Sequence, residues 1–201
     1  MNASIITSLI GMAIAASWTP GPNNSMLASS GATYGIRASI PHVLGIILGF
    51  PLMIFLVGLG LGEVFRSHPL LHQVLRYAGA AMMLWIAWKI ANAAPPGQPG
   101  KTSRPLSFVQ AAGFQWINPK GWMAAIAVTT QFVTVDHPVR TSLIVAGVFV
   151  LAGLSSTMAW LVFGQVVGRF LNSPAKLKIF NYSMALMLVG FLILLLIKRH
   201  N

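Results

Sequence analysis

Two short stretches place helix-breaking residues and amides inside apolar segments. The first is Thr19-Pro20-Gly21-Pro22-Asn23-Asn24. Pro20 and Pro22 lack a backbone donor and obstruct the carbonyl four residues earlier, so a helix cannot run through them. In lipid, each freed backbone group costs several kcal/mol unless protein or trapped water satisfies it. We therefore expect this break to face an interior cavity.

Asn23 and Asn24 stand at the expected start of the second half-helix. Backbone N–H groups and the positive end of the helix dipole attract an anion there, such as a carboxylate. The alternative is a simple proline kink in which these asparagines cap the new helix. The two interpretations overlap, because a capped break is still able to bind a substrate.

The second break lies between Gln115 and Trp122, where Gln115 and Asn118 accompany Pro119 and Lys120. A lysine inside a membrane costs about 2.5–3.5 kcal/mol on insertion scales. Lys120 is about 14 residues into its apolar block, too deep to reach the headgroups easily. A cation there suits a substrate carboxylate or repels other cations. The alternative is that Lys120 snorkels from a shorter helix.

Signatures of other chemistry are missing from the sequence. The only acids are Glu63 and Asp136, and both fall at the ends of apolar blocks, so a carboxylate proton relay is not supported. There is no cysteine, no HExxH zinc motif and no Walker loop, and no serine has a mid-membrane histidine partner. We expect neither an enzyme nor ATP-driven transport, and no metal or cofactor.

Composition places the chain in a membrane. Of 201 residues, 56% are hydrophobic and 7% are charged, against about 25% charged in soluble domains. The formal charge of +11 comes from basic residues that sit almost entirely between apolar runs. They are expected to contact lipid headgroups and set orientation, not to bind nucleic acid.

Six apolar blocks predict an all-α polytopic membrane protein with six transmembrane helices, since a span needs about 20 residues. A linker rich in proline and glycine, 94–106, divides the chain into two halves, 1–93 and 107–201. The predicted blocks are 3–34 with its break, 38–61, 70–90, 106–135 with its break, 141–167 and 177–197.

The halves resemble each other. In both, the first block is the broken one, and three spans per half make the second half enter from the opposite side. This is the inverted repeat of many secondary transporters. Residues matching at an offset of 105 are Pro69 with Pro174, Tyr77 with Tyr182, Ala80 with Ala185 and Met82 with Met187.

Loop charges predict the orientation. One side carries seven basic residues and the other carries five with both acids, so the first side is expected to be cytoplasmic and both termini outside. The first set is Arg37, Lys89, Lys101, Arg104, Arg169, Lys176 and Lys178. The second set is Arg66, Arg76, Arg140, Lys198 and Arg199.

Several other residues have structural interpretations beside functional ones. Glycine pairs four residues apart, such as Gly45/Gly49 and Gly164/Gly168, favour helix packing in the bundle or a homodimer face. His42 is expected at the membrane interface, with proton coupling as the alternative. Trp116 and Trp122 are interfacial anchors or cavity walls. Ser155, Ser156 and Thr157 are expected to pack or hydrogen-bond between helices.

These motifs resemble the LysE/RhtB family of amino-acid exporters over essentially the whole chain. The similarity lies in Thr19–Asn24, Gly35 before Arg37, residues 45–50 and Gln115–Trp122. The run from Ala78 to Ala91 is similar to a helix of the cysteine/O-acetylserine exporter subgroup. The resemblance implies a bacterial inner-membrane exporter with six helices in two inverted halves, driven by membrane potential or a proton gradient. It also implies that Pro20–Asn24 and Gln115–Lys120 form the broken-helix site.

Two function classes follow. The first is a secondary exporter of small neutral amino acids, such as cysteine-related compounds, homoserine or threonine, with basic amino acids as the alternative substrate. The second is a membrane accessory subunit whose breaks are only structural kinks. They differ in whether Asn23, Asn24, Gln115, Asn118 and Lys120 converge on one cavity.

Overall fold

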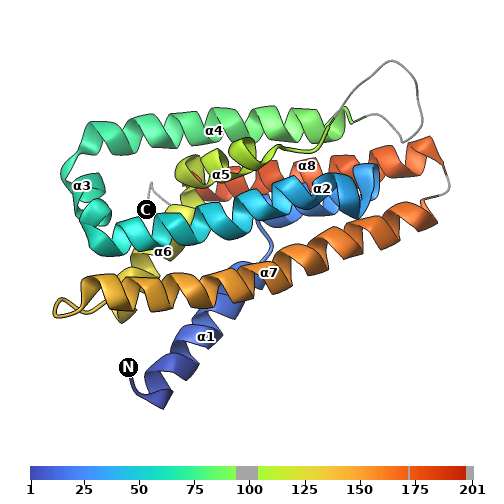
Figure 1. Cartoon of the computed structure of the whole chain (residues 1–201). Coiled ribbons are helices and arrows are strands. Elements are labelled where there is room, and N and C mark those ends of the chain that lie inside the picture. The colour runs from blue at the N-terminus through green and yellow to red at the C-terminus, as the bar shows by residue number, and fades with distance from the viewer. Residues whose placement is uncertain (94–103, 172, 198–201) are drawn as a thin grey trace.

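The computed structural model describes residues 1–93, 104–171 and 173–197, and this part of the chain is helical without strands (Figure 1). The all-α prediction is confirmed. In chain order the elements are α1 (Ala3–Trp18), α2 (Pro22–Leu56), a π-helical turn η1 (Val57–Leu61), α3 (Gly62–Ser67), α4 (Pro69–Ala91), α5 (Phe108–Ile117), α6 (Pro119–Phe132), α7 (Pro138–Phe170) and α8 (Pro174–Ile197).

Local sequence explains where the helices begin. Five of them start at a proline, which suits the first helical position because its missing N–H would have no partner there anyway. These prolines are Pro22, Pro69, Pro119, Pro138 and Pro174. Two further helices, α1 and α5, begin at a side-chain cap. Asn2 accepts from Ile5 N at 3.0 Å, and Ser107 forms a capping box with Gln110.

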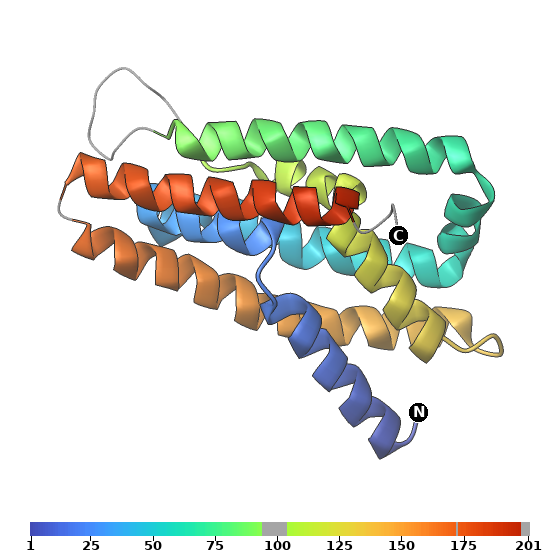
Figure 2. The same ribbon diagram turned by 180° about the vertical axis from the view of Figure 1, so that it is seen from behind.

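Gly35 folds α2 back on itself. Its φ of 78° lies in the left-handed region that favours glycine, and the helical backbone is interrupted there. Ser30 Oγ hydrogen-bonds with His42 Nδ1 at 3.3 Å. In a straight helix these residues would be about 18 Å apart along the axis. The half-helix 22–34 therefore runs against the segment 36–56, as Figures 1 and 2 show, and the predicted gap between the first two blocks is confirmed.

Successive segments run back and forth along the bundle. The start of α1, the α3 corner, the α6–α7 connection and the end of α8 lie at one end (Figures 1 and 2). The turn at Gly35, the end of α4 and the α7–α8 connection lie at the other. The described backbone therefore groups the predicted basic positions by these two ends. Lys101, Lys198 and Arg199 lie outside the described residues, as does most of the predicted linker 94–106, and which end is cytoplasmic stays a prediction.

Length and composition make several described helices suited to a membrane. Three stretches are long and apolar enough to span one, namely Pro22–Leu61, Pro138–Phe170 and Pro174–Leu194, and Ala3–Trp18 and Tyr77–Ala91 are shorter apolar helices. Large apolar side chains along these helices point outward, among them Leu52, Leu84, Leu151 and Leu186, each more than half exposed. Apolar exposure on this scale is typical of surfaces that lipid covers.

Glycines bring helix backbones into direct contact, as the predicted packing role requires. A side chain at Gly164 would collide with the carbonyl oxygen of Ala28, so α7 lies directly against the half-helix 22–34. A side chain at Gly49 would lie 2.8 Å from the Ala112 Cα, so the segment 36–56 also lies close to α5. Small residues thus allow the helices that carry the breaks to pack closely against their neighbours.

Two apolar clusters fill the interior. One includes Met26, Ile46 and Leu188 and extends toward the Gly35 turn. The other includes Leu9, Met53 and Val145 and extends toward the opposite end. The polar groups of the two helix breaks lie between these clusters.

Candidate functional site

The first break separates α1 from α2 and leaves carbonyls at the end of α1 without helical partners. Asn24 Nδ2 donates to the carbonyl oxygens of Ser17 and Thr19, both at 3.1 Å. Ser156 Oγ, from α7, donates to the Ser17 carbonyl at 2.8 Å. Asn24 therefore caps the end of α1, and not the start of the following helix as the kink interpretation supposed.

Gly21 precedes α2 in extended backbone and provides no side-chain cap. The next residue, Pro22, has no N–H. The N–H groups of Asn23 and Asn24 thus lie in the first turn of α2, where no helical carbonyl accepts from them. That they attract an anion stays a prediction.

The second break separates α5 from α6 and is satisfied within its own half. Asn118 Oδ1 accepts from Lys120 N at 3.2 Å and caps α6. Trp122 Nε1 donates to the Trp116 carbonyl at 2.8 Å, and the two indoles meet edge to face at 6.4 Å. Neither tryptophan lines the cavity described below, so both pack the break together.

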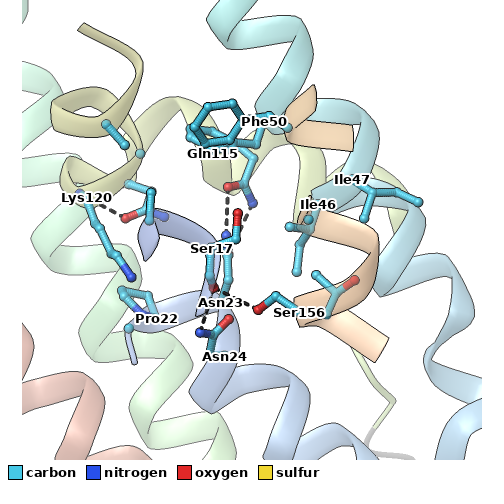
Figure 3. Close-up of a pocket in the computed structure, with 18 of the residues that line it drawn as sticks. Ser17, Pro22, Asn23, Asn24, Ile46, Ile47, Phe50, Gln115, Lys120 and Ser156 are labelled. Carbon is cyan, nitrogen blue, oxygen red and sulfur yellow. Dashed lines mark hydrogen bonds between the residues drawn. The ribbon is translucent and has the colours of Figure 1, made fainter. Parts of the chain in front are cut away.

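The two breaks meet through reciprocal side-chain contacts (Figure 3). Asn23 Nδ2 donates to Gln115 Oε1 at 3.0 Å, and Gln115 Nε2 donates to Asn23 Oδ1 at 3.2 Å. Lys120 Nζ donates to the Thr19 carbonyl at 2.5 Å and approaches the Pro20 carbonyl at 3.5 Å. Lys120 is partly buried and reaches across to the end of α1, where Thr19 and Pro20 are exposed.

A cavity of about 60 Å³ lies at this junction. Phe50 and Phe149 supply apolar walls from α2 and α7, and Ile46 and Ile47 close the side toward the Gly35 turn. Of the nine residues predicted for the site, seven line this cavity: Gly21, Pro22, Asn23, Asn24, Gln115, Asn118 and Lys120. Pro20 and Pro119 do not line it and instead create the breaks.

Part of the cavity lining was not predicted from the sequence. Ser17, Ser156 and Thr157 also border the cavity, so the serine–threonine cluster predicted to pack between helices also contributes hydroxyls to the site. The signal was present as three consecutive hydroxyl residues in an apolar block. Nothing in the sequence alone tied them to the end of α1.

His42 lies elsewhere than expected. Its side chain is fully buried between the half-helix 22–34 and the segment 36–56, so the prediction of an interfacial histidine is wrong. A histidine at the membrane interface would need an exposed side chain. The turn at Gly35 packs the half-helix 22–34 against the segment 36–56, and this packing covers His42.

The charge at the cavity is positive only. The chain's two acidic side chains, Glu63 and Asp136, are exposed and lie near the end of the bundle that holds the start of α1. Within the described residues, no three His, Cys, Asp or Glu side chains come close enough to hold a metal ion. The arrangement offers one ammonium, helix-start N–H groups and several amide and carbonyl oxygens. These are groups that bind a small zwitterion without chemical change.

The chain is similar to known proteins over most of its length. The family model described as LysE type translocator matches residues 14–199. Proteins named cysteine/O-acetylserine efflux protein, from Escherichia coli strain K12, Escherichia coli O1:K1 and Shigella sonnei strain Ss046, are 29% identical over 193 residues, covering 94% of this chain and 96% of theirs. No solved structure matches the chain. The match spans both breaks and nearly every described helix, and the chain belongs to the LysE family of translocators, membrane transporters and not enzymes.

Proposed function

We propose that this protein is a secondary exporter of small neutral amino acids or their derivatives, of the cysteine/O-acetylserine type, in the bacterial inner membrane. The observation that carries the proposal is the meeting of two broken helices at one cavity that holds the Lys120 ammonium and no acid. The names of the relatives agree with this substrate class, and their sources agree with a bacterial membrane.

The carboxylate of the substrate has a cationic corner to bind. Lys120 Nζ would lie 2.9 Å from a side-chain carbon at Gly21, so the ammonium rests directly over the residue that precedes α2. The N–H groups of Asn23 and Asn24 begin the helix beside it. A carboxylate here would gain charge-assisted hydrogen bonds, which are roughly twice as strong as neutral ones.

The ammonium of the substrate requires oxygen acceptors. Asn23 and Gln115 now satisfy each other through a reciprocal amide pair. Opening that pair would free two amide oxygens and two amide NH₂ groups toward the cavity. In this proposal the empty transporter keeps its site closed with the pair that the substrate later replaces.

A dibasic amino acid does not suit this cavity. Its second positive charge would enter beside Lys120, and the only acids of the chain lie elsewhere. An unpaired charge inside a membrane costs several kcal/mol. The cavity therefore favours neutral substrates over lysine and arginine.

The cavity must enlarge during transport. At about 60 Å³ it has room for a few water molecules, less than an amino acid needs. Apolar clusters border it toward both ends of the bundle. We propose that the two halves rock about the cavity, so that one cluster opens while the other stays closed.

Six crossings in two inverted halves fit this motion. Each half contains a broken helix, a long helix and a third helix that begins at a proline, Pro69 or Pro174. Tyr77 and Tyr182, at equivalent positions of α4 and α8, are both exposed. The third helices also pack against each other.

Efflux from cells tests the substrate class. Bacteria that express the chain would be loaded with labelled amino acids, and release would be followed for cysteine, O-acetylserine, homoserine, threonine, lysine and arginine. We expect faster release of the neutral compounds than from cells carrying an empty vector. Equal release of every compound with and without the chain would reject the proposed function.

A further inference from the structure

His42 has an unsatisfied nitrogen one helical turn from the central cavity. Its side chain is fully buried, and Ser30 occupies only Nδ1. His42 Nε2 is buried without a hydrogen-bond partner. Ile46, four residues later and therefore one turn away, lines the central cavity. Buried polar atoms without partners are rare in native proteins, so this nitrogen calls for a partner in another conformation.

A second, smaller cavity of about 30 Å³ adjoins His42 on the side of the Gly35 turn. Its charged and titratable groups are Tyr34 from α2, Lys89 from α4 and Arg104 before α5. From α8, Asn181 forms only neutral contacts there: Ser29 Oγ donates to Asn181 Oδ1 at 2.9 Å, and Asn181 Nδ2 donates to Thr33 Oγ1 at 3.2 Å. The surroundings thus supply cations and neutral groups but no carboxylate.

Few other groups are available to carry a proton through this protein. An exporter that works against a gradient needs a coupled ion, and the carboxylates that usually relay protons in transporters lie away from both cavities. Lys120 is held by the Thr19 and Pro20 carbonyls. Histidine is the side chain whose charge ordinarily changes between pH 5 and 8. His42 lines the second cavity and lies one helical turn from Ile46, which lines the central cavity.

We propose that His42 carries the coupling proton of the transport cycle, which extends the proposed export function. When the central cavity opens to the outside, a proton binds Nε2 and converts the neutral imidazole to imidazolium. When the second cavity opens at the Gly35 end, the same proton leaves Nε2. One proton enters for each outward step of the amino acid, and no other bond is made or broken. In the closed state His42 is neutral and Nε2 has no partner.

Two assays on purified protein in liposomes separate coupling from substrate passage. Counterflow of labelled O-acetylserine needs no ion gradient. Accumulation of the label in acid-loaded vesicles needs proton exchange, whichever way the protein is inserted. The variants are His42→Gln and His42→Asn, which keep a polar side chain that does not titrate. Ser142→Ala is the matched control, because Ser142 is also fully buried with an unpartnered oxygen.

The proposal predicts that at least one His42 variant keeps about half or more of the wild-type counterflow, while acid-driven accumulation falls to background. Counterflow by that variant should also lose its dependence on pH between about 5 and 8. Ser142→Ala should keep both activities. Acid-driven accumulation by either variant would overturn the proposal, and so would loss of counterflow in both, which would mark His42 as structural. Wild-type counterflow without acid-driven accumulation would also overturn it, whereas absent wild-type counterflow of every amino acid would reject the export function itself.

Discussion

Lys120 Nζ donates to the backbone carbonyl of Thr19 at 2.5 Å, although 101 residues separate them. The contact joins the start of α6 to the end of α1. It places the ammonium of the cavity lining where the carbonyls at the end of α1 meet the start of α6. Lys120 therefore forms a hydrogen bond between the two halves and is also the candidate ligand for the substrate carboxylate.

Gly21→Ala tests whether the position of the ammonium matters, with the charge left in place. The new methyl carbon would lie 2.9 Å from Lys120 Nζ and Cδ, so the flexible end of the lysine must move away. We expect the variant to fold and to lose about tenfold or more of its efflux, because a displaced ammonium cannot meet the carboxylate. Gly11→Ala is the control, since nothing lies within 4 Å of its added carbon. Equal efflux in the two variants would show that the spacing at Gly21 is unimportant.

Lys120→Met removes the charge and keeps the length of the side chain. Loss of a charge-assisted contact to the substrate should lower efflux by about 10–100-fold. Thr19 keeps its hydrogen bond from Asn24, so the melting temperature in detergent should fall only slightly. Lys178→Met serves as the control, because that ammonium lies over the Tyr182 ring away from the cavity. Full efflux by Lys120→Met would show that the lysine only links the two halves and does not bind the substrate.

Much of this architecture follows from sequence because proline and glycine act locally. The predicted interruptions at Thr19–Asn24 and at Asn118 coincide with the ends of α1 and α5, and the predicted third and sixth blocks begin within three residues of Pro69 and Pro174. These helix ends depend on a missing proline N–H or on a left-handed glycine φ, and each of these is a property of one or two residues. The sequence placed a broken first block in each half but left open whether the breaks converge, which the structure shows them to do.

What sequence did not provide are contacts between distant segments. Asn24 caps a helix that precedes it, and Ser156 reaches the same carbonyl from α7. His42 is buried where Gly35 folds one segment onto another and α4 lies alongside. Each of these depends on the relative placement of two helices, and periodicity along one helix carries no such information.

The Asn23–Gln115 pair should be energetically coupled. Asn23→Ala and Gln115→Ala each break both hydrogen bonds, so the double variant should lose far less efflux and stability than the sum of the single losses. We expect each single variant to reduce efflux, and a coupling free energy of about 0.5–3 kcal/mol from thermal unfolding of all four proteins. Strictly additive losses would contradict a functional pair.

Gly164→Ala should damage the fold more than transport chemistry. An added methyl group would collide with the Ala28 carbonyl oxygen and force the half-helix 22–34 away from α7. Overpacking of this kind costs about 1–3 kcal/mol, which a thermal melt of the purified protein would detect. Gly147→Ala on the same helix has open space around its added carbon and should melt at or slightly above the wild-type temperature. Equal melting of the two variants would mean that α7 does not press on the half-helix.

The most direct test of the central claim is counterflow by the purified chain in liposomes, comparing O-acetylserine with lysine at equal concentration. Purification removes every other protein, so transport must come from this chain alone. The positive, acid-free cavity predicts rapid exchange of O-acetylserine and exchange of lysine at least about tenfold slower. Faster exchange of lysine, or exchange of neither compound, would contradict the assignment of Lys120 and the two helix breaks to a site for neutral amino acids.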